Sequence, residues 1–330
     1  MKPSSQAWLE QHWYGAPGVL WLLFPLEIIF RCTVSIRKFL FKKNILSSWR
    51  SPVPVIVIGN IVVGGVGKTP LVIAIVEYLQ AQGFQPGVVS RGYGGQPKQH
   101  LQSVEKESLP AEVGDEPLLI VRRTGCRCVV GANRADAARK LLAEGNCDVV
   151  ISDDGLQHYA LERDIEIVVI DGARQFGNGH CLPVGPLREP QQRLELVDFE
   201  VYNGNRAADS MRISAAGWVN VLSGDSCESL PVEDGIENHA VCGIGNPQRF
   251  YSTLEAQGLS FQSHSFADHH HFNADDLVFS ENARVLMTEK DAVKCRHFAT
   301  ENMWYLTVDA VVSQTLLTQI SERLSAIVDK

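Results

Sequence analysis

The residues with the clearest chemistry form one glycine-rich turn, Gly64-Gly65-Val66-Gly67-Lys68-Thr69-Pro70. β-Branched residues, Val55 to Ile58, precede this turn, and a helical pattern of apolar residues, Leu71 to Gln80, follows it. A strand, a glycine-rich turn and a helix in this order are the context of a phosphate-binding loop. In such a loop the backbone N–H groups converge on a phosphate, the lysine reaches the β- and γ-phosphates, and the threonine hydroxyl binds Mg²⁺. The turn therefore predicts a nucleoside triphosphate site, with Lys68 as a catalytic residue and Thr69 as a metal ligand.

One position departs from the usual motif. A phosphate-binding loop usually begins with a small residue five positions before Gly67, and Val62 stands there. The alternative interpretation is a simple glycine-rich turn that leaves Lys68 in solvent. Because the glycines, the lysine and the threonine are all present at the required spacing, we favour the nucleotide site.

Two adjacent carboxylates, Asp153 and Asp154, end the buried-type strand Asp148–Ser152. A strand end in an α/β protein is the usual place for the carboxylate that holds Mg²⁺, directly or through water. Adjacent carboxylates repel each other unless a cation neutralises both, which favours a metal site over a solvated Asp-Asp-Gly turn. Gln157 and His158 follow within one turn, so we expect them to line the same cleft.

Three further segments carry polar side chains that each allow two interpretations. Asp115 and Glu116 occupy a predicted helix start, where the helix dipole favours negative charge, so a helix cap explains them as well as a catalytic role does. The rings of Asp268–His271 cannot all face one ion, because neighbours on a short segment point in different directions. A carboxylate beside an imidazole suits a general base, and a solvated polar loop is the alternative. In a rigid segment rich in glycine and proline, Arg188 is a candidate phosphate ligand and Glu189 a candidate support for the metal.

From Pro52 to about Pro190, apolar runs of strand length alternate with helical segments. This alternation predicts an α/β fold of the P-loop NTPase type, a parallel sheet flanked by helices. Ligands then bind beyond the carboxyl ends of the strands, where the glycine-rich turn, Arg91 and the Asp153-Asp154 pair all fall. A second strand–loop–helix pattern from Ala240 onward predicts a second, smaller α/β lobe. The boundaries we expect are 1–50 for an N-terminal helical segment, 51–195 for the P-loop core, 196–239 for a connection and 240–330 for the second lobe.

The first fifty residues differ from the rest of the chain. An apolar run, Val19–Phe30, is followed by a stretch, Arg31–Lys43, in which Arg and Lys alternate with apolar residues. A membrane-spanning helix needs about 20 uninterrupted apolar residues, and Pro25 and Glu27 interrupt this run. A signal peptide places its basic residues before the apolar run, not after it. We therefore expect helices that lie on a membrane surface, with packing against the protein's own core as the alternative.

Composition excludes some functions. With 330 residues the chain is long enough for two domains, and its 45% hydrophobic and 21% charged residues are ordinary for a globular protein. A net charge of −8 argues against binding nucleic acid through bulk electrostatics. The 8 cysteines are scattered, which favours reduced thiols in a cytosolic compartment over a disulfide framework.

Taken together, these stretches resemble the tetraacyldisaccharide 4′-kinase family, the lipid A 4′-kinases, over nearly the whole chain. No single stretch is specific, but the ordered set is. The segments that carry the resemblance are Gly59-Asn60, Gly64–Pro70, Ser90–Gly94, Gly114–Pro117, Asp153–His158, Leu187–Pro190, Asp268–His270 and Thr288–Asp291.

The resemblance implies an enzyme at the cytoplasmic face of the inner membrane, bound peripherally or monotopically. Such an enzyme transfers the γ-phosphate of ATP, with Mg²⁺, to the 4′-hydroxyl of a tetraacylated glucosamine disaccharide 1-phosphate in lipid A biosynthesis. In this family Asp115 would lie nearest the acceptor hydroxyl and work as a dyad with His269. Asp153, Asp154 and Glu189 would be metal or active-site carboxylates, and neither nucleic acid nor an obligate protein partner is expected. The residues we expect to bind the substrate are Arg91, Gln157, His158 and Arg188.

Two other classes of protein stay open as alternatives. A membrane-cycling partition ATPase, a nucleotide switch, shares the glycine-rich loop but carries a lysine just before the glycine pair, where this chain has Val63. A nucleotide-driven metallochaperone would have to bring Cys126, Cys128 and the histidine run together, and their spacing gives no indication of this. We favour the lipid kinase over both.

Overall fold

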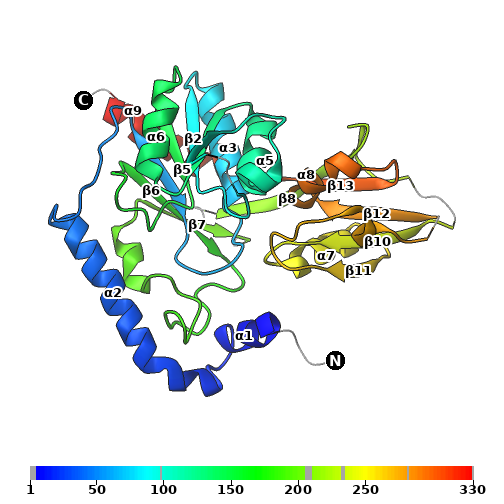
Figure 1. Cartoon of the computed structure of the whole chain (residues 1–330), viewed down its shortest axis with the longest axis horizontal. Coiled ribbons are helices and arrows are strands. Elements are labelled where there is room, and N and C mark those ends of the chain that lie inside the picture. The colour runs from blue at the N-terminus through cyan, green and yellow to red at the C-terminus, as the bar shows by residue number, and fades with distance from the viewer. Residues whose placement is uncertain (1–4, 97–98, 205–209, 232–234, 281, 329–330) are drawn as a thin grey trace.

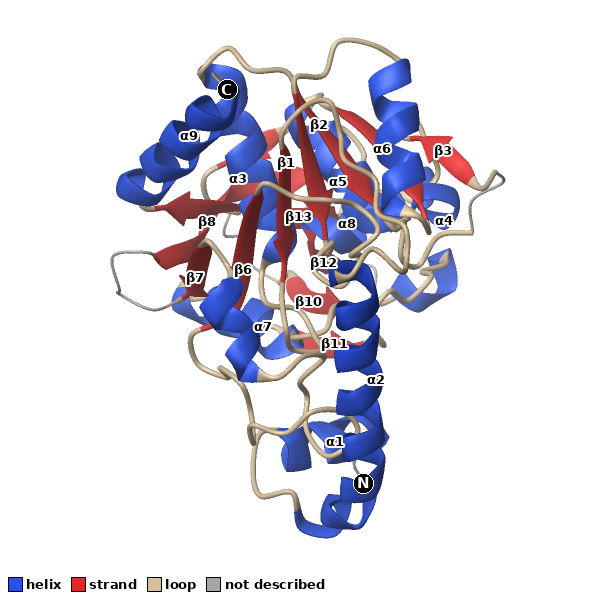
Figure 2. Cartoon of the chain, turned by 90° about the vertical axis from the view of Figure 1, so that its left-hand side faces the viewer, coloured by secondary structure: helices blue, strands red, loops and turns tan. Residues whose placement is uncertain are grey.

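One continuous sheet runs through both lobes of the protein (Figures 1 and 2). A computed structural model describes residues 5–96, 99–204, 210–231, 235–280 and 282–328. Strands flanked by helices confirm the predicted α/β architecture. Across the sheet the strands run in the order β11 (Gln262–Ser265), β10 (Glu237–Cys242), β12 (Ala283–Thr288), β13 (Met303–Val312), β8 (Ser210–Asn220), β7 (Phe199–Asn203), β6 (Ile165–Asp171), β1 (Val55–Gly59), β5 (Val149–Asp153), β2 (Pro86–Ser90), β4 (Arg127–Gly131) and β3 (Leu101–Ser103), and β9 (Ser226–Cys227) pairs with β8.

The first lobe holds the parallel strands from β7 to β4, with β3 antiparallel at the edge. β1 lies between β5 and β6 and is buried along its whole length, which explains its uninterrupted run of apolar residues. β5 lies between β1 and β2. The ends of these parallel strands therefore bring Gly59, Asp153 and Ser90 to one edge of the sheet, where the site is built.

Helices cover both faces of the first-lobe sheet. On one face α3 (Lys68–Ala81), α5 (Asp115–Thr124) and α9 (Gln314–Val328) share an apolar cluster with the strands. On the other face α6 (Arg134–Ala143) contributes to a second cluster. A single turn, α4 (Pro110–Val113), directly precedes α5. The core strands are thus shielded from water on both sides, as a parallel sheet requires.

The second lobe is a smaller α/β unit. β11, β10, β12 and β13 are parallel to one another. α7 (Pro247–Ala256) and α8 (Glu289–Cys295) belong to two separate apolar clusters with these strands. Three short 3₁₀ helices complete the chain outside the N-terminal segment: η2 (Gln191–Leu196), η3 (Ala274–Leu277) and η4 (Arg296–Phe298).

Two long antiparallel strands, β8 and β13, join the lobes. β13 pairs with β12 of the second lobe and, along most of its length, with β8. β8 in turn pairs with β7 of the first lobe at Tyr202 and Asn203. Residues 196–239, for which the sequence predicts a connection, contain β7, β8 and β9, so strand pairing links the two lobes.

The N-terminal segment consists of α1 (Ser5–Trp13), the 3₁₀ helix η1 (Gly18–Leu23) and α2 (Phe24–Lys42). Figure 2 shows α1 and α2 extending beyond the sheet. Pro25 stands in the first turn of α2, where a proline costs no hydrogen bond, so it begins the helix and does not break it. Together η1 and α2 are long and apolar enough to cross a membrane, and only 11% of their apolar window is buried.

Candidate functional site

The glycine-rich turn forms the loop between β1 and α3, and α3 begins directly after Gly67. The φ of Gly67 is 97°, a left-handed conformation that side chains disfavour. A Cβ at this position would lie 2.5 Å from Nδ2 of Asn203, which donates a hydrogen bond of 2.9 Å to the Val66 carbonyl. Val62, unusual for a phosphate-binding loop, is buried and forms a β-bridge with Leu187. Packing against neighbouring segments therefore explains both the required glycine and the departure from the motif.

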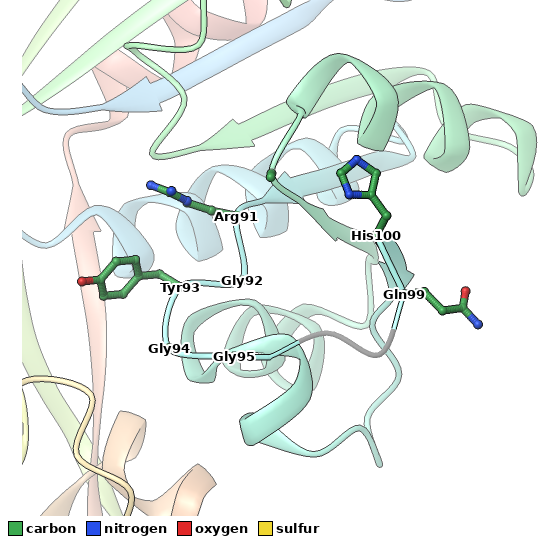
Figure 3. Close-up of a pocket in the computed structure, with 8 residues that line it drawn as sticks. Arg91, Gly92, Tyr93, Gly94, Gly95, Gln99 and His100 are labelled. Atoms are coloured by element: carbon green, nitrogen blue, oxygen red, sulfur yellow. The ribbon is translucent and has the colours of Figure 1, made fainter.

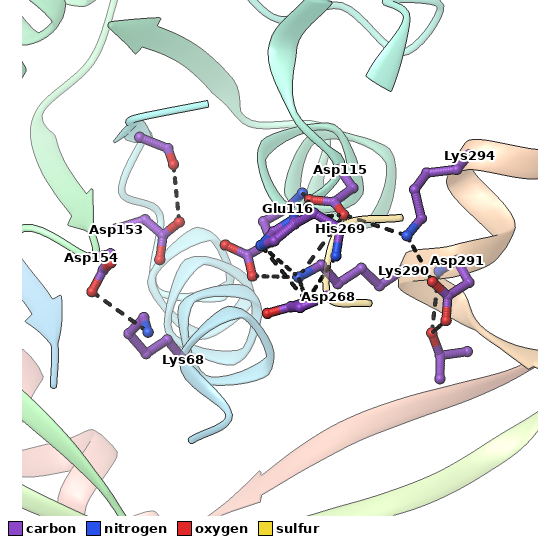
Figure 4. A network of polar contacts seen from close by, with 12 residues as sticks. Lys68, Asp115, Glu116, Asp153, Asp154, Asp268, His269, Lys290, Asp291 and Lys294 are labelled. Atoms are coloured by element: carbon purple, nitrogen blue, oxygen red, sulfur yellow. Dashed lines mark hydrogen bonds and ion pairs between the residues drawn. The ribbon is translucent and has the colours of Figure 1, made fainter. Parts of the chain in front are cut away.

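Lys68 lies beside the predicted carboxylates at the start of α3 (Figure 4). Its Nζ is 3.5 Å from Oδ1 of Asp154 and 3.4 Å from Oδ1 of Asn60. Nη1 of Arg188 contacts both oxygens of Asp154, at 3.2 and 3.1 Å. Burial by itself would raise the pKa of Asp154, but Lys68 and Arg188 outweigh it and lower the pKa to about 2. Asp154 is thus an ionised carboxylate between two cations, and the structure brings together three of the residues predicted from sequence.

Asp153 is buried at the end of β5. Its Oδ2 accepts a hydrogen bond of 3.1 Å from the Ser90 hydroxyl. Burial, helped by the charges of Glu116 and Asp154, raises the pKa of Asp153 to about 7. Its Oδ1 is buried without a hydrogen-bond partner among the described residues.

An unpartnered carboxylate oxygen beside the ionised Asp154 fits a divalent cation, which prefers oxygen ligands. Thr69 lies in the first turn of α3, at the position where a phosphate-binding loop supplies its metal-binding hydroxyl. The described residues hold no group of three or more His, Cys, Asp or Glu side chains arranged around a metal. Mg²⁺ would therefore take most of its ligands from phosphate oxygens and water.

Glu189 is buried beside the loop and is held by protein donors. Gln157 Nε2 donates to its Oε1 at 3.0 Å, and the Tyr159 hydroxyl donates to its Oε2 at 2.6 Å. Arg193 Nε forms an ion pair with Oε2 at 3.5 Å. Gln157 Nε2 also reaches the backbone carbonyl of Asn60, at 3.1 Å. Both oxygens of Glu189 thus serve to link its segment to the start of the phosphate-binding loop.

Asp115 and His269 meet across the two lobes. Asp115 is the first residue of α5 and is buried, while His269 lies between β11 and η3 with a φ of 59°. Nδ1 of His269 is 3.1 Å from each oxygen of Asp115. Burial by itself would raise the pKa of Asp115, but the hydrogen bond from His269 and the charge of Lys290 outweigh it and lower the pKa. The ionised Asp115 accepts a hydrogen bond from the Nδ1–H of His269, which leaves the lone pair of the ring on Nε2.

A cavity of about 330 Å³ lies beside Asp153, Asp154 and Arg188, which are among its lining residues. Burial, together with the charges of Arg134 and Arg91, lowers the pKa of His158 to about 4, so this ring is neutral at pH 7. Guanidinium groups therefore supply the positive charge of the cavity. The residues that line it are Arg37 of α2, Ser90, Arg91, Tyr93, Glu116, Arg134, Asp153, Asp154, Gln157, His158 and Arg188.

A neighbouring hollow of about 560 Å³ shares Arg91 and Tyr93 with this cavity (Figure 3). It is lined also by the backbone of Gly92–Gly95, by Gln99 and by His100. In Figure 3 the side chains of Arg91 and Tyr93 both extend away from Gln99. Arg91 thus stands at the boundary between the two hollows.

Several residues of the site have no sequence signal of their own. Asn60 contacts Lys68, but its position before the glycines marks no known role. Arg134 is buried at the start of α6, where burial lowers its pKa to about 10, and reads in the sequence as an ordinary helical residue. Arg37 lies on α2, far from the other cavity residues along the chain. Only the tertiary fold brings these three side chains to the site.

A phosphate-binding loop, paired carboxylates at the next strand end and an Asp–His pair from the opposite lobe define a phosphotransferase of the P-loop class. The sequence profile of the tetraacyldisaccharide-1-P 4′-kinase family, LpxK, matches residues 19–325. The chain belongs to this family, and the resemblance inferred from its ordered motifs is confirmed.

Individual relatives agree with the family profile. A tetraacyldisaccharide 4′-kinase of Methylobacillus flagellatus is 47% identical over 340 residues, which cover 100% of this chain and 99% of the relative. That of Pseudomonas paraeruginosa is 48% identical over 319 residues, 94% of this chain and 95% of the relative. The crystal structure of LpxK from Aquifex aeolicus in complex with ATP covers 93% of this chain and 99% of its own, with 25% identity and a TM-score of 0.76.

Proposed function

We propose that this chain transfers the γ-phosphate of ATP to the 4′-hydroxyl of a tetraacylated glucosamine disaccharide 1-phosphate, a step of lipid A biosynthesis. The observation that carries the proposal is the Asp115–His269 pair, which joins the two lobes. Glu116, the neighbour of Asp115, lines a cavity together with the paired carboxylates at the end of β5. The nucleotide-switch alternative is not favoured, because its loop lysine is missing and the family match covers nearly the whole chain.

The first lobe binds ATP in this proposal. The backbone from Gly64 to Gly67 surrounds the phosphates, and Lys68 moves from Asp154 to the γ-phosphate when the nucleotide is present. Thr69, Asp153 and Asp154 would hold Mg²⁺, and the ion would supply positive charge beside the phosphates. Glu189 would support this site indirectly, because Gln157, Tyr159 and Arg193 hold its oxygens. Arg188, released from Asp154, stabilises negative charge on the phosphoryl group.

The second lobe supplies the base. Because both oxygens of Asp115 face Nδ1, the free atom of the dyad is Nε2 of His269, which takes the proton of the 4′-hydroxyl. Asp115 then stabilises the imidazolium that forms. In this proposal His269 lies next to the acceptor hydroxyl, whereas the resemblance implies that Asp115 lies nearest to it. Gly245 of the second lobe lies against the loop, since a Cβ there would be 3.3 Å from the Gly65 nitrogen, and the closed lobes exclude water.

The arginine-lined cavity receives the sugar part of the acceptor. Arg91, Gln157 and His158 line it from the first lobe, and Arg37 reaches it from α2. A guanidinium binds a phosphate or a sugar hydroxyl with paired donors, so these side chains suit a phosphorylated disaccharide. The acyl chains then stay in the membrane beneath α2.

The proposal places the enzyme at the cytoplasmic face of the inner membrane, as a peripheral or monotopic protein. The support is the exposed apolar surface of η1 and α2, together with the basic residues that follow it. The scattered free cysteines are consistent with a reducing compartment.

The direct test is ATP-dependent phosphorylation of a tetraacyl disaccharide 1-phosphate in detergent micelles, with the product followed by mass. The acceptor should gain one phosphate with the wild-type protein and almost none with Lys68→Ala, since the γ-phosphate loses its main cation. ATP hydrolysis stimulated by vesicles without phosphorylation of this lipid would favour the switch ATPase. Near-normal turnover by Lys68→Ala would contradict the assignment of the loop.

A further inference from the structure

Lys290, the second residue of α8, occupies the centre of a charged network between the lobes (Figure 4). Its Nζ is 2.9 Å from Oε1 of Glu116 on α5. It is 3.5 Å from Oδ1 of Asp268 and 3.9 Å from Oδ2 of Asp115. It is also 3.5 Å from Nε2 of His269, the atom that the proposed function assigns as the base. One ammonium group therefore contacts Glu116, Asp268 and Asp115 as well as Nε2 of His269.

Lys290 is charged in this setting. Burial by itself would lower the pKa of Lys290, but Glu116, Asp115 and Asp268 outweigh it and raise the pKa. An ammonium has three N–H donors and no acceptor. The ammonium can donate to Nε2 of His269 only when that atom carries no proton, and Nδ1–H then donates its hydrogen bond to Asp115.

The charges around His269 explain why the contact between Lys290 and Nε2 matters for the ring. Asp115 and Glu116 face the ring region from α5, and Asp268 precedes it, with Oδ1 3.8 Å from Nε2. These carboxylates favour the imidazolium, in which Nε2 is protonated and useless as a base. From α8, Lys290 opposes them directly, while Lys294 Nζ is 3.9 Å from Asp115 and 2.8 Å from Asp291. The Tyr93 ring covers the remaining side, with ring centroids 4.7 Å apart.

We propose that Lys290 is a positioning residue that keeps Nε2 of His269 unprotonated and ready to accept the proton of the acceptor hydroxyl. The inference rests on the proposed function, because it concerns the base of that reaction. The contact to Nε2 is long, so an acceptor hydroxyl replaces it while Lys290 stays fixed by Glu116. Because Lys290 and Glu116 belong to different lobes, the base is prepared only when the lobes are closed.

The experiment compares variants of the full chain in detergent micelles. Lys290→Met and Lys290→Gln remove the charge, and Lys290→Arg retains it. The matched control is Arg123→Met, which also removes a cation between α5 and α8, where Arg123 pairs with Glu289 at 3.0 Å and with Asp309. Arg123 contacts neither member of the dyad in the described contacts, so this control reports the cost of weakening the interface alone.

Two measurements report the protonation of the His269 ring. In the pH profile of kcat, the neutral variants should move the acid limb upward by about one pH unit, because loss of a nearby cation favours the protonated ring. Lys290→Arg and Arg123→Met should leave this limb in place. Imidazole ¹⁵N shifts of His269, assigned with His269→Gln, should show a larger protonated fraction in the neutral variants than in the wild type at the same pH.

The outcomes separate the two claims. An acid limb and a ring signal that are the same in the wild type, Lys290→Met and Lys290→Gln would overturn the role of Lys290. A limb that moves equally in Arg123→Met would also overturn it, since the interface and not the charge would be responsible. If the wild type does not phosphorylate the lipid, the proposed function fails, and the ¹⁵N signals still decide whether Lys290 controls the ring.

Discussion

At the scale of single residues, Asp115 and His269 act as one unit, because His269 Nδ1 faces both oxygens of the carboxylate. Asp115→Asn and His269→Gln should each lower kcat by about 100-fold or more, with little change in KM for ATP, since the loss falls on proton transfer. The double variant should be only slightly slower than either single variant. Steady-state kinetics with the lipid acceptor checks this. Effects that multiply in the double variant would show that the two residues work independently.

A second prediction concerns His158 and the pH dependence of the free energy of unfolding. The structure lowers the pKa of His158 to about 4 from an ordinary value of 6.5, through burial and the charges of Arg134 and Arg91. Between these values the unfolded chain takes up a proton that the folded chain does not, so acid destabilises the fold. The free energy of unfolding of the wild type, relative to His158→Gln, should fall by about 1–2 kcal/mol between pH 7 and pH 5.

Denaturant unfolding of both proteins at each pH measures this difference. A difference that stays constant over this range would mean that the ring has the same pKa in the folded and the unfolded protein, so that neither burial nor the arginines shift it. Arg134→Met should reduce the pH dependence, because Arg134 is the second contributor after burial.

How much of the site could be predicted differs from residue to residue. The phosphate-binding loop and the Asp153-Asp154 pair were readable because their chemistry lies within a few consecutive residues at a strand end. The Asp115–His269 pair could not be predicted in this way, because its members are 154 positions apart. Only the packing of α5 against the second lobe joins them. The resemblance to a family supplied that pairing. Arg134 and Arg37 carry no local pattern at all, since a cavity lined from several elements leaves none.

At the scale of elements, Glu27 explains how α2 is held against the first lobe. It interrupts an apolar run in the sequence, yet it is buried. Its Oε1 accepts a hydrogen bond of 3.0 Å from the backbone of Cys181, and its Oε2 is 3.0 Å from Nδ1 of His180. These contacts attach α2 to the segment that also carries Arg188.

Glu27→Leu should therefore loosen α2 and the segment around residue 180. The variant leaves the Cys181 N–H buried without a partner, which costs about 1–3 kcal/mol. Hydrogen exchange should increase at α2 and at residues 175–190, and kcat in micelles should fall. The control is Cys32→Ala, an exposed position on the same helix. Unchanged exchange in Glu27→Leu would show that other contacts are sufficient to hold α2.

How readily a strand can be predicted from the sequence depends on how completely it is buried. Strands such as β1 and β6 are buried on both faces, so their apolar runs identify them at once. β8 and β13 mix buried and exposed positions without a clean alternation, so no pattern in the sequence indicates that they join the lobes. Their pairing is non-local, and no turn between them marks a hairpin.

At the scale of the whole molecule, the apolar N-terminal segment reaches the cavity beside the paired carboxylates. Arg37 of α2 lines the same space as Arg188 and the paired carboxylates of β5. In the proposed function, the reacting hydroxyl of the lipid enters this cavity while its acyl chains remain in the bilayer. The second lobe closes from the other side and brings His269. The proposed function therefore requires that the exposed apolar face of the N-terminal segment rests in the membrane.

That requirement can be tested by changing the face without disturbing the core. Leu22, Ile29 and Ile36 are 83%, 62% and 59% exposed, so replacing all three by Gln should leave the fold intact. If these side chains enter the membrane, the triple variant should bind anionic vesicles at least about 100-fold more weakly, since each buried aliphatic chain contributes roughly 1–3 kcal/mol. Vesicle flotation measures binding, and an unchanged affinity for ATP shows that the first lobe is intact. The control replaces three similarly exposed residues elsewhere on the protein, Leu196, Val278 and Val311. Equal flotation of the two triple variants would refute the assignment of this face to the membrane.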